Sequence, residues 1–317
     1  HRILIYLPQK NQNTMSQQGG SIKSILFAFA ANIGIAITKT VAAVLTGSGA
    51  MLAEAIHSYA DSGNQILLFA GIRASKRKPN AEHPLGYGKS TFFWSFVVAL
   101  ILFSVGGLFS VYEGIHKLES HEGLQSPYIA IIVLSVSILL ESASLYGCVT
   151  QIRKVKRKDE SIIKWFSHSR QSELVVVLGE DVAALLGLMF ALAAVILTIV
   201  TGNPVFDAIG SIGIGVLLVV VSMFLAVKIK GLLIGQSAEK ETVDALKTFI
   251  EAQPQVETLI SIITQQLGPE IMLAVKVKMQ NTDSGTAQAN QINDCEKAIR
   301  KAFPDVKWIF FEPDIED

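Results

Sequence analysis

Long apolar stretches occupy most of the chain, each broken only briefly by polar positions. A helix needs roughly 20 mostly apolar residues to cross the hydrocarbon core of a bilayer. Six stretches meet this length, at residues 22–45, 48–72, 91–118, 127–150, 174–201 and 204–233. The pattern therefore predicts an all-α transmembrane bundle of six helices over residues 21–235.

The residues after the last apolar stretch show short periodic patterns that are typical of a small soluble domain. Five segments carry them, at residues 239–252, 256–266, 271–280, 286–303 and 306–311. The first and fourth have helical spacing, whereas the others are expected to be strands, with Gly268-Pro269 as the turn between two of them. This order predicts a cytoplasmic α+β domain, ferredoxin-like, over residues 236–317.

Residues 1–20 are assigned to an N-terminal extension outside both domains. Residues 1–14 precede Met15 and differ in texture from the rest of the chain. Their apolar run is too short for the core of a signal peptide. We interpret residues 1–14 as vector-derived or as translated from upstream of Met15.

Lysine and arginine are unevenly divided between the loops that join the apolar stretches. The loops after the second and fourth stretches read RASKRKPNAEHPLGYGK and RKVKRKDESIIKWFSHSR, and Lys228 and Lys230 end the sixth. Basic residues collect on the cytoplasmic side of membranes. We therefore expect a multi-pass protein of a bacterial inner or cell membrane with both termini in the cytoplasm. The basic runs are interpreted as anchors that contact membrane lipid, the alternative being a regulatory site for a lipid or a partner.

The overall composition excludes two other classes of protein. The 27 basic residues balance the 27 acidic ones, so no basic excess favours binding to nucleic acid. The two cysteines, Cys148 and Cys295, lie far apart and form no CxxC motif, which argues against a disulfide framework and against a thiolate zinc site. We expect ordinary buried or half-buried thiols at both positions.

Ionisable residues within the second apolar stretch suggest a functional site, because charge inside a bilayer is costly. The stretch carries Glu54, His57 and Asp61. His57 and Asp61 are four residues apart and therefore share one helix face. An imidazole and a carboxylate placed in this way can bind one cation such as zinc. The alternative is a mutual hydrogen bond in a packed helix interface.

The fifth apolar stretch carries two adjacent carboxylates, Glu180 and Asp181. Adjacent positions on a helix point about 100° apart. We expect Asp181 to face an ion, and Glu180 to contact a neighbouring helix or a proton path. The alternative is a purely structural pair.

Three further polar residues lie at membrane depth, and for these we favour structural roles. Asn32 and Lys39 belong to the first stretch and Glu141 to the fourth. Lys39 is expected to reach the interface or to pair with a carboxylate. Glu141 is expected to bond a serine of a facing helix or to take part in proton transfer.

Five motifs occur in order between about residues 20 and 317. They are TGSGAMLAEAIHSYADSGNQ (46–65), EHPLGYGK (82–89), YEGIHKL (112–118), DAIGSIGIG (207–215) and LLIGQSA (232–238). Together they resemble the cation diffusion facilitator family of zinc transporters. The resemblance implies six transmembrane helices, a cytoplasmic ferredoxin-like domain, a homodimer, and exchange of metal for protons.

Carried over by position, the resemblance places metal ligands at His57, Asp61 and Asp181. The family usually has a histidine four residues before the last of these, where this chain has Val177. The Glu180-Asp181 pair is instead similar to a subgroup with adjacent Glu and Asp, so that the fourth ligand is Glu180, water or another helix. One histidine with several carboxylates makes Mn²⁺ and Fe²⁺ competitors of Zn²⁺ as the transported ion.

The other metal sites of the family are expected to be weak or absent. In the loop after the second stretch, His83 matches one ligand position, but Asn80 and Tyr87 stand where an aspartate and a histidine are often found. No histidine occurs after His168. The tail, residues 236–317, is therefore expected to keep the dimer-forming fold without metal sensing, unless carboxylates such as Glu312 and Asp314 substitute for histidine.

The predicted function is efflux of a divalent metal ion, foremost Zn²⁺, by a metal/proton antiporter that works by alternating access. The alternatives are an exporter of Mn²⁺ or Fe²⁺ with the same fold, and a membrane partner subunit that does not itself transport. Such a subunit would be free to lose His57 and Asp61. An enzyme is not expected, because the sequence has no nucleophile motif and no nucleotide-binding glycine loop.

Overall fold

The computed structural model of the chain describes residues 18–120, 125–157 and 159–316, which form two compact units. The first unit comprises Lys23–Ala74 and Ser90–Gly231, and the second includes Ser75–Lys89 and Leu232–Asp317. The N-terminal extension lies almost wholly outside the described residues.

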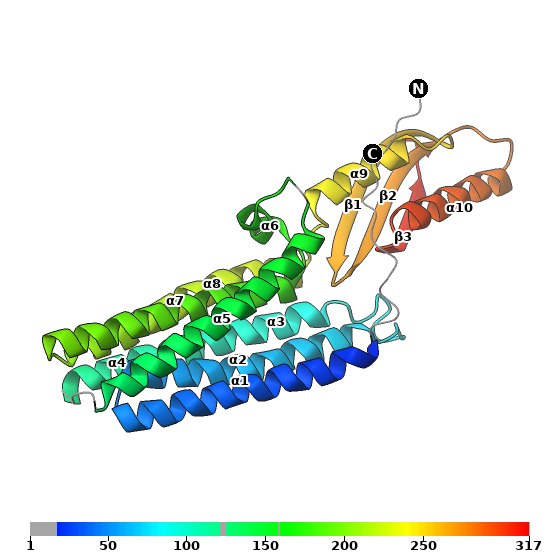
Figure 1. The fold of residues 1–317 in the computed structure, drawn as a ribbon. Helices are drawn as coiled ribbons and strands as arrows, with labels where there is room; N and C mark the ends of the chain where they lie inside the picture. Colours follow the sequence, from blue (N-terminus) through cyan, green and yellow to red (C-terminus); the bar gives the residue numbers. More distant parts are fainter. Residues whose placement is uncertain (1–17, 121–124, 158, 317) are drawn as a thin grey trace. The chain divides into compact units, whose positions relative to one another are not determined.

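Long helices that lie side by side make up the first unit (Figure 1). They are α1 (Gln18–Thr46), α2 (Gly49–Ser75), α3 (Ser90–Ile101), the π-helical η1 (Leu102–Leu108), α4 (Phe109–Ser120), α5 (Pro127–Val155), α7 (Ser172–Thr201) and α8 (Val205–Ile234). A helix therefore occupies each of the six predicted ranges. The short α6 (Ile162–His168), which the sequence pattern did not predict, lies in the basic loop after α5.

Among the residues that the structure describes, four helical segments are long and apolar enough to cross a membrane. They are the continuous run Ser90–Glu119, α5, α7 and α8. Helix α1 is apolar over Asn32–Thr46, whereas α2 is interrupted by polar residues, many of them buried. The described part of the chain is thus mostly helical, with four membrane-capable helices, and membrane crossing by α1 and α2 stays a prediction.

Large apolar side chains cover much of the outer surface of these helices. Val44, Leu139, Val200 and Val227 are among those with more than two thirds of the side chain exposed. Water would make this surface unfavourable by about 25 cal/mol per Å² of apolar area. Hydrocarbon removes that cost, so the outer surface fits a lipid environment.

The helical run Ser90–Glu119 packs against α8 with an unusually short distance between the two backbones, and glycines make this approach possible. A Cβ atom at Gly107 would lie 2.7 Å from Cγ2 of Val219. A Cβ atom at Gly215 would lie 2.6 Å from the backbone nitrogen of Val111. Small residues at such crossings allow helix backbones in membranes to approach closely.

The C-terminal part of the second unit contains a small three-stranded sheet. Its elements occur in the order α9 (Lys240–Glu251), β1 (Val256–Leu267), β2 (Glu270–Met279), α10 (Gly285–Ala302) and β3 (Val306–Pro313). The strand order is β1-β2-β3, with β2 antiparallel to β1 and parallel to β3. The predicted helices and strands of the tail agree with these bounds to within two residues.

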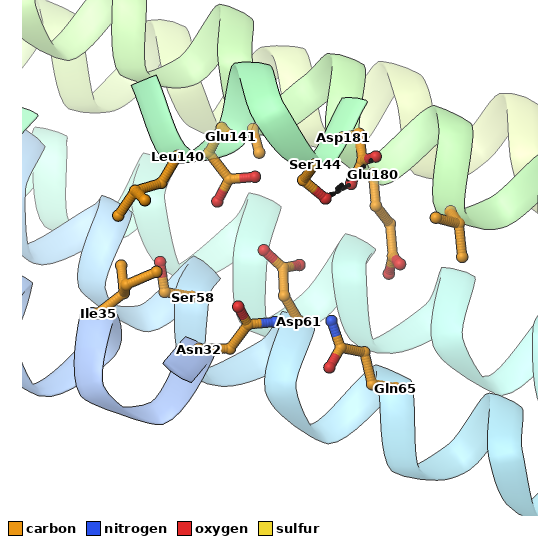
Figure 2. Close-up of a pocket in the computed structure, with 12 residues that line it drawn as sticks. Asn32, Ile35, Ser58, Asp61, Gln65, Leu140, Glu141, Ser144, Glu180 and Asp181 are labelled. Atoms are coloured by element: carbon orange, nitrogen blue, oxygen red, sulfur yellow. Dashed lines mark hydrogen bonds between the residues drawn. The ribbon is translucent and has the colours of Figure 1, made fainter. Parts of the chain in front are cut away.

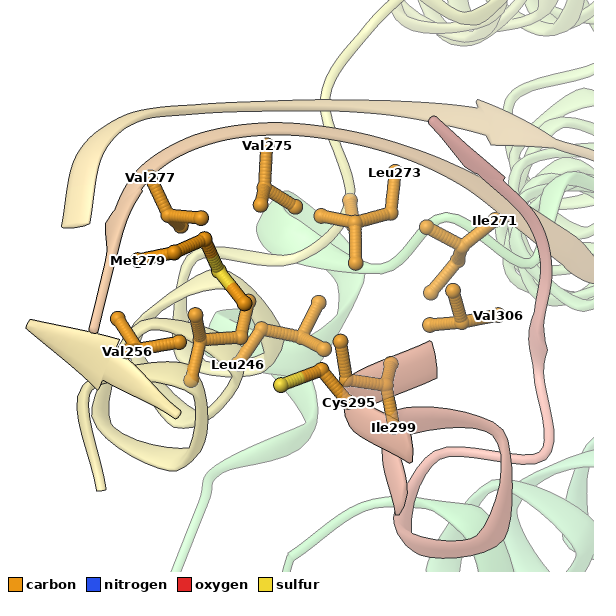
Figure 3. Packing of buried hydrophobic residues seen from close by; sticks show 12 residues of the cluster. Leu246, Val256, Ile271, Leu273, Val275, Val277, Met279, Cys295, Ile299 and Val306 are labelled. Atoms are coloured by element: carbon orange, nitrogen blue, oxygen red, sulfur yellow. The ribbon is translucent and has the colours of Figure 1, made fainter. Parts of the chain in front are cut away.

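Alternation along β2 builds the core of this unit. Every second residue of the strand is buried, and these side chains face α9 and α10 (Figure 3). They are Ile271, Leu273, Val275, Val277 and Met279. Leu246 of α9 and Ile299 of α10 complete the cluster from the helix side. One face of the sheet is thereby covered by both helices.

Candidate functional site

The polar residues of α2 lie on the side of the helix that faces its neighbours. Glu54 and His57 are buried, and the side chain of Asp61 is 20% exposed. Spacings of three and four residues put all three on one face, as the sequence predicts for His57 and Asp61.

Glu54 is paired with a lysine of α1. Lys39 Nζ lies 3.2 Å from Glu54 Oε2 and donates a hydrogen bond to Ser58 Oγ at 2.8 Å. Both charged side chains are almost fully buried. Of the two roles considered for Lys39, pairing with a carboxylate is the one found, and Glu54 is thereby neutralised.

His57 has a carboxylate beside it but no hydrogen bond. Its Nε2 atom lies 3.5 Å from Asp61 Oδ2, and within the described part of the chain neither ring nitrogen has a hydrogen-bond partner. The ring is 1% exposed and reaches η1, where a Cβ atom at Gly106 would lie 3.8 Å from His57 Nδ1. Unbonded buried nitrogens are costly, which suggests that the ring has a ligand to bind.

The adjacent carboxylates of α7 reach different neighbours. Glu180 Oε1 accepts a hydrogen bond from Asn64 Nδ2 of α2 at 2.6 Å. Asp181 accepts a longer one, at 3.4 Å, from Ser144 Oγ of α5. This divergence results from the angle between successive helical positions. The partners Asn64 and Ser144 carried no signal in the sequence beyond lying three residues from Asp61 and Glu141.

A cavity of about 110 Å³ lies among α1, α2, α5 and α7 and contains the carboxylates (Figure 2). Of the residues that the structure describes, four acidic ones line it, Asp61, Glu141, Glu180 and Asp181, and no basic one does. The remaining lining residues are Asn32, Ile35, Ser58, Gln65, Leu140, Ser144, Val177 and Ala184. A water molecule takes up about 30 Å³ in the liquid, so the cavity has room for a metal ion with some of its water.

Three of the four candidate ligands, Asp61, Glu180 and Asp181, therefore line one cavity. His57 is not part of the lining and lies behind Asp61. Across the described ranges, no three His, Cys, Asp or Glu side chains are close enough to hold an ion together. The carboxylates would have to draw inward to coordinate one.

Asp207 is a buried carboxylate outside the set of candidate ligands predicted from the sequence. It accepts hydrogen bonds from Ser48 Oγ at 2.5 Å and from the backbone nitrogen of Gly49 at 2.7 Å. These groups lie at the N-terminus of α2, where a negative charge is favourable. Asp207 thus fixes the start of the helix that carries His57 and Asp61.

His83, the residue proposed for a weak second site, lies in the second unit. Its ring stacks on Tyr87 with 4.3 Å between centroids, and Asn80 Nδ2 donates to the Tyr87 hydroxyl at 3.1 Å. The two residues that replace the usual ligands are therefore bonded to each other.

Comparison with known proteins gives one family. Residues 25–234 match the model of the cation efflux transmembrane domain. The chain is 37% identical to the mitochondrial proton-coupled zinc antiporter SLC30A9 of Xenopus laevis over 231 residues. These residues cover 73% of this chain and 41% of that protein. It is 33% identical over 227 residues to metal tolerance protein C4 of Arabidopsis thaliana, 71% of this chain and 49% of the other.

A relative of similar length is the manganese efflux system protein MneP of Bacillus subtilis. The identity is 25% over 298 residues, which cover 91% of this chain and 94% of that protein. By contrast, the chain spans less than half the length of the Xenopus and Arabidopsis relatives. The match to the transmembrane domain model covers well over half of the chain. The chain therefore belongs to the cation efflux family, also called the cation diffusion facilitators.

Proposed function

We propose that this protein exports a divalent transition-metal ion, foremost Zn²⁺, from the cytoplasm in exchange for protons. The observation that carries the proposal is the cavity among helices of the first unit, in which the described lining residues include four acidic side chains and no basic one. Uncompensated carboxylates are costly at membrane depth. A divalent cation or protons would supply the missing positive charge.

Exchange results from competition for the same oxygen atoms. A metal ion binds ionised carboxylates and neutral imidazole, so that binding releases protons and protonation releases metal. In the proposed cycle, Asp61, Asp181 and His57 bind the ion on the cytoplasmic side, with Glu180 next to them. On the other side the metal leaves and protons take its place, which returns the site to neutrality.

The names of the relatives support this class of substrate. One is described as a proton-coupled zinc antiporter and another as a manganese efflux protein. Zinc accepts histidine and carboxylate ligands, whereas Mn²⁺ favours oxygen donors. We keep Zn²⁺ as the proposed cargo, with Mn²⁺ or Fe²⁺ as the alternative. Metal uptake into proteoliposomes, measured with each ion in turn, tests the choice.

The proposed architecture is a homodimer in which each chain has six membrane spans and a ferredoxin-like cytoplasmic domain. The order of elements in the tail, α-β-β-α-β, supports the domain type. Six helices of sufficient length support the spans, although α2 must then carry its polar face inside the bundle.

Topology gives a direct test of this arrangement. In a variant without Cys148 and Cys295, we expect Gln125→Cys to react with a membrane-impermeant maleimide in intact cells. Lys78→Cys and Glu316→Cys should react only after the cells are permeabilised, because the lysine- and arginine-rich side is cytoplasmic. If intact cells showed labelling of Glu316→Cys but not of Gln125→Cys, the topology would be the reverse of the predicted one.

Glu180→Gln separates a metal ligand from a hydrogen-bonding residue. The amide can still accept the bond from Asn64, so the shape of the site is preserved while one negative charge is lost. Because one oxygen of Glu180 is already engaged, we expect a smaller loss of flux than with Asp181→Ala, together with an altered pH dependence. A loss as complete as that of Asp181→Ala would make Glu180 an essential ligand. Asn64→Ala, which frees that oxygen, serves as the matched comparison.

A further inference from the structure

Glu141 of α5 is the acidic residue of the cavity that lies outside the sequence motifs of the family. It projects from α5 into the space that Asp61 enters from α2 (Figure 2). It is close enough to interact electrostatically with both Asp61 and Asp181. It is thus placed with the candidate ligands, on a helix that has supplied none of them so far.

The sequence left two roles open for Glu141, a bond to a serine of a facing helix or a part in proton transfer, and the first of these is not found. Within the described residues Glu141 forms no hydrogen bond and no ion pair. Ser58 of α2, the cavity-lining serine on a facing helix, accepts a hydrogen bond from Lys39 Nζ at 2.8 Å. On α5 itself, Ser142 Oγ donates to the backbone oxygen of Ile138 at 2.6 Å, and Ser144 Oγ donates to Asp181. The nearby hydroxyl groups of α5 are therefore engaged elsewhere.

Lys39 of α1 does not serve Glu141 as a counter-charge either. Lys39 Nζ is bonded to Glu54 and to Ser58. A carboxylate among apolar helices without a paired cation is unfavourable by several kcal/mol. A cation in the cavity would remove that cost.

A second observation points to a ligand at the same place. His57 is buried, both of its ring nitrogens lack a hydrogen-bond partner among the described residues, and Nε2 faces Asp61. Asp61 Oδ1 is likewise buried without a partner. The unbonded imidazole and carboxylate oxygen lie next to the cavity that Glu141 enters, so the site combines free oxygen and nitrogen donors.

We propose that Glu141 is a ligand of the transported ion, so that α2, α5 and α7 each contribute at least one carboxylate. The inference rests on the proposed transport function and specifies its substrate. The donor set then consists of three carboxylates, those of Asp61, Glu141 and Asp181, and the imidazole of His57, and it suits Mn²⁺ as well as Zn²⁺. Glu141 then determines the affinity for Mn²⁺, the harder of the two ions.

The test measures Zn²⁺ and Mn²⁺ binding by titration calorimetry on the purified full-length protein, and flux in proteoliposomes. Glu141→Gln keeps the size of the side chain and removes its charge. We expect the affinity for Mn²⁺ to fall roughly tenfold or more, of the order seen when groups that support a metal site are removed. The affinity for Zn²⁺ should fall less, because His57 remains. Glu141→His should restore Zn²⁺ binding but not Mn²⁺ binding.

Glu113→Gln, the same change on α4 at a residue that does not line the cavity, is the control and should leave both affinities unchanged. Wild-type affinities in Glu141→Gln, with binding lost in Asp181→Ala, would overturn the role of Glu141 and leave the transport site intact. If Glu141→Gln lowered the affinities for Zn²⁺ and Mn²⁺ equally, and Glu141→His did not restore Zn²⁺ binding, Glu141 would act through its charge alone and would not be a ligand. Unchanged binding in Asp181→Ala would contradict the proposed site itself, and this inference with it.

Discussion

Alanine at Asp61 or at Asp181 is expected to reduce metal flux to background. The two carboxylates come from α2 and α7 and line the same cavity. Removing one charged partner from a poorly solvated pair typically costs about 3–5 kcal/mol, which corresponds to a loss of ion affinity of a hundredfold or more. Flux of Zn²⁺ into proteoliposomes measures the effect.

The same two substitutions should leave a folded protein. Among the described residues neither carboxylate is paired with a lysine or an arginine, so we expect the melting temperature in detergent to stay the same or to rise when either is removed. Asp244→Ala, on the exposed surface of α9, is the matched control and should transport as the wild type does. Normal flux in Asp181→Ala would contradict the assignment, because only Glu180 would then remain on α7 to hold the ion.

Replacement of Lys39 by methionine should lower the free energy of unfolding more than any other substitution proposed for this protein. Lys39 and Glu54 form an ion pair at 3.2 Å with side chains that are 1% and 0% exposed. Methionine leaves Glu54 as a buried charge without its partner, which costs about 3–5 kcal/mol. Denaturant unfolding in detergent, monitored by circular dichroism, measures the change.

Two further variants show whether the lost partner is the cause. Lys39→Met combined with Glu54→Gln should recover most of the stability, because no unpaired charge remains. Lys278→Met breaks an exposed ion pair with Glu257 in the sheet and should cost no more than about 1 kcal/mol. If Lys39→Met alone were as stable as the wild type, the pair would not support the packing of α1 on α2.

The sequence predicted the tail well because its elements have simple periods. Apolar residues alternate along β2, and Gly268 has a positive φ of 68° at the turn before it. The π-helical section η1 and the short α6 escaped prediction. A π-helix has no period of its own that a sequence pattern reveals, and η1 is a short section around the buried Gly106 and Gly107. Helix α6 has only 7 residues, about two turns, which is too short for a helical period to stand out.

For the site, residue spacing predicted which side chains share a face of one helix, but the sequence did not predict the contacts between helices. The interval from His57 to Asp61 predicted a shared face, and the two side chains lie 3.5 Å apart. That Glu180 would turn to Asn64 and Asp181 to Ser144 depends on how α2, α5 and α7 pack. Glu141 was assigned a structural role because nothing in its own helix indicated that it would face Asp61.

Proton movement coupled to metal entry tests the central claim most directly. Purified protein would be reconstituted into vesicles that contain a pH-sensitive dye, and Zn²⁺ would be added outside. If carboxylates exchange metal for protons, the lumen should become more alkaline as Zn²⁺ enters, and Asp181→Ala should show neither change. Zinc entry without a change of luminal pH, or an equal response in Asp181→Ala, would contradict the account.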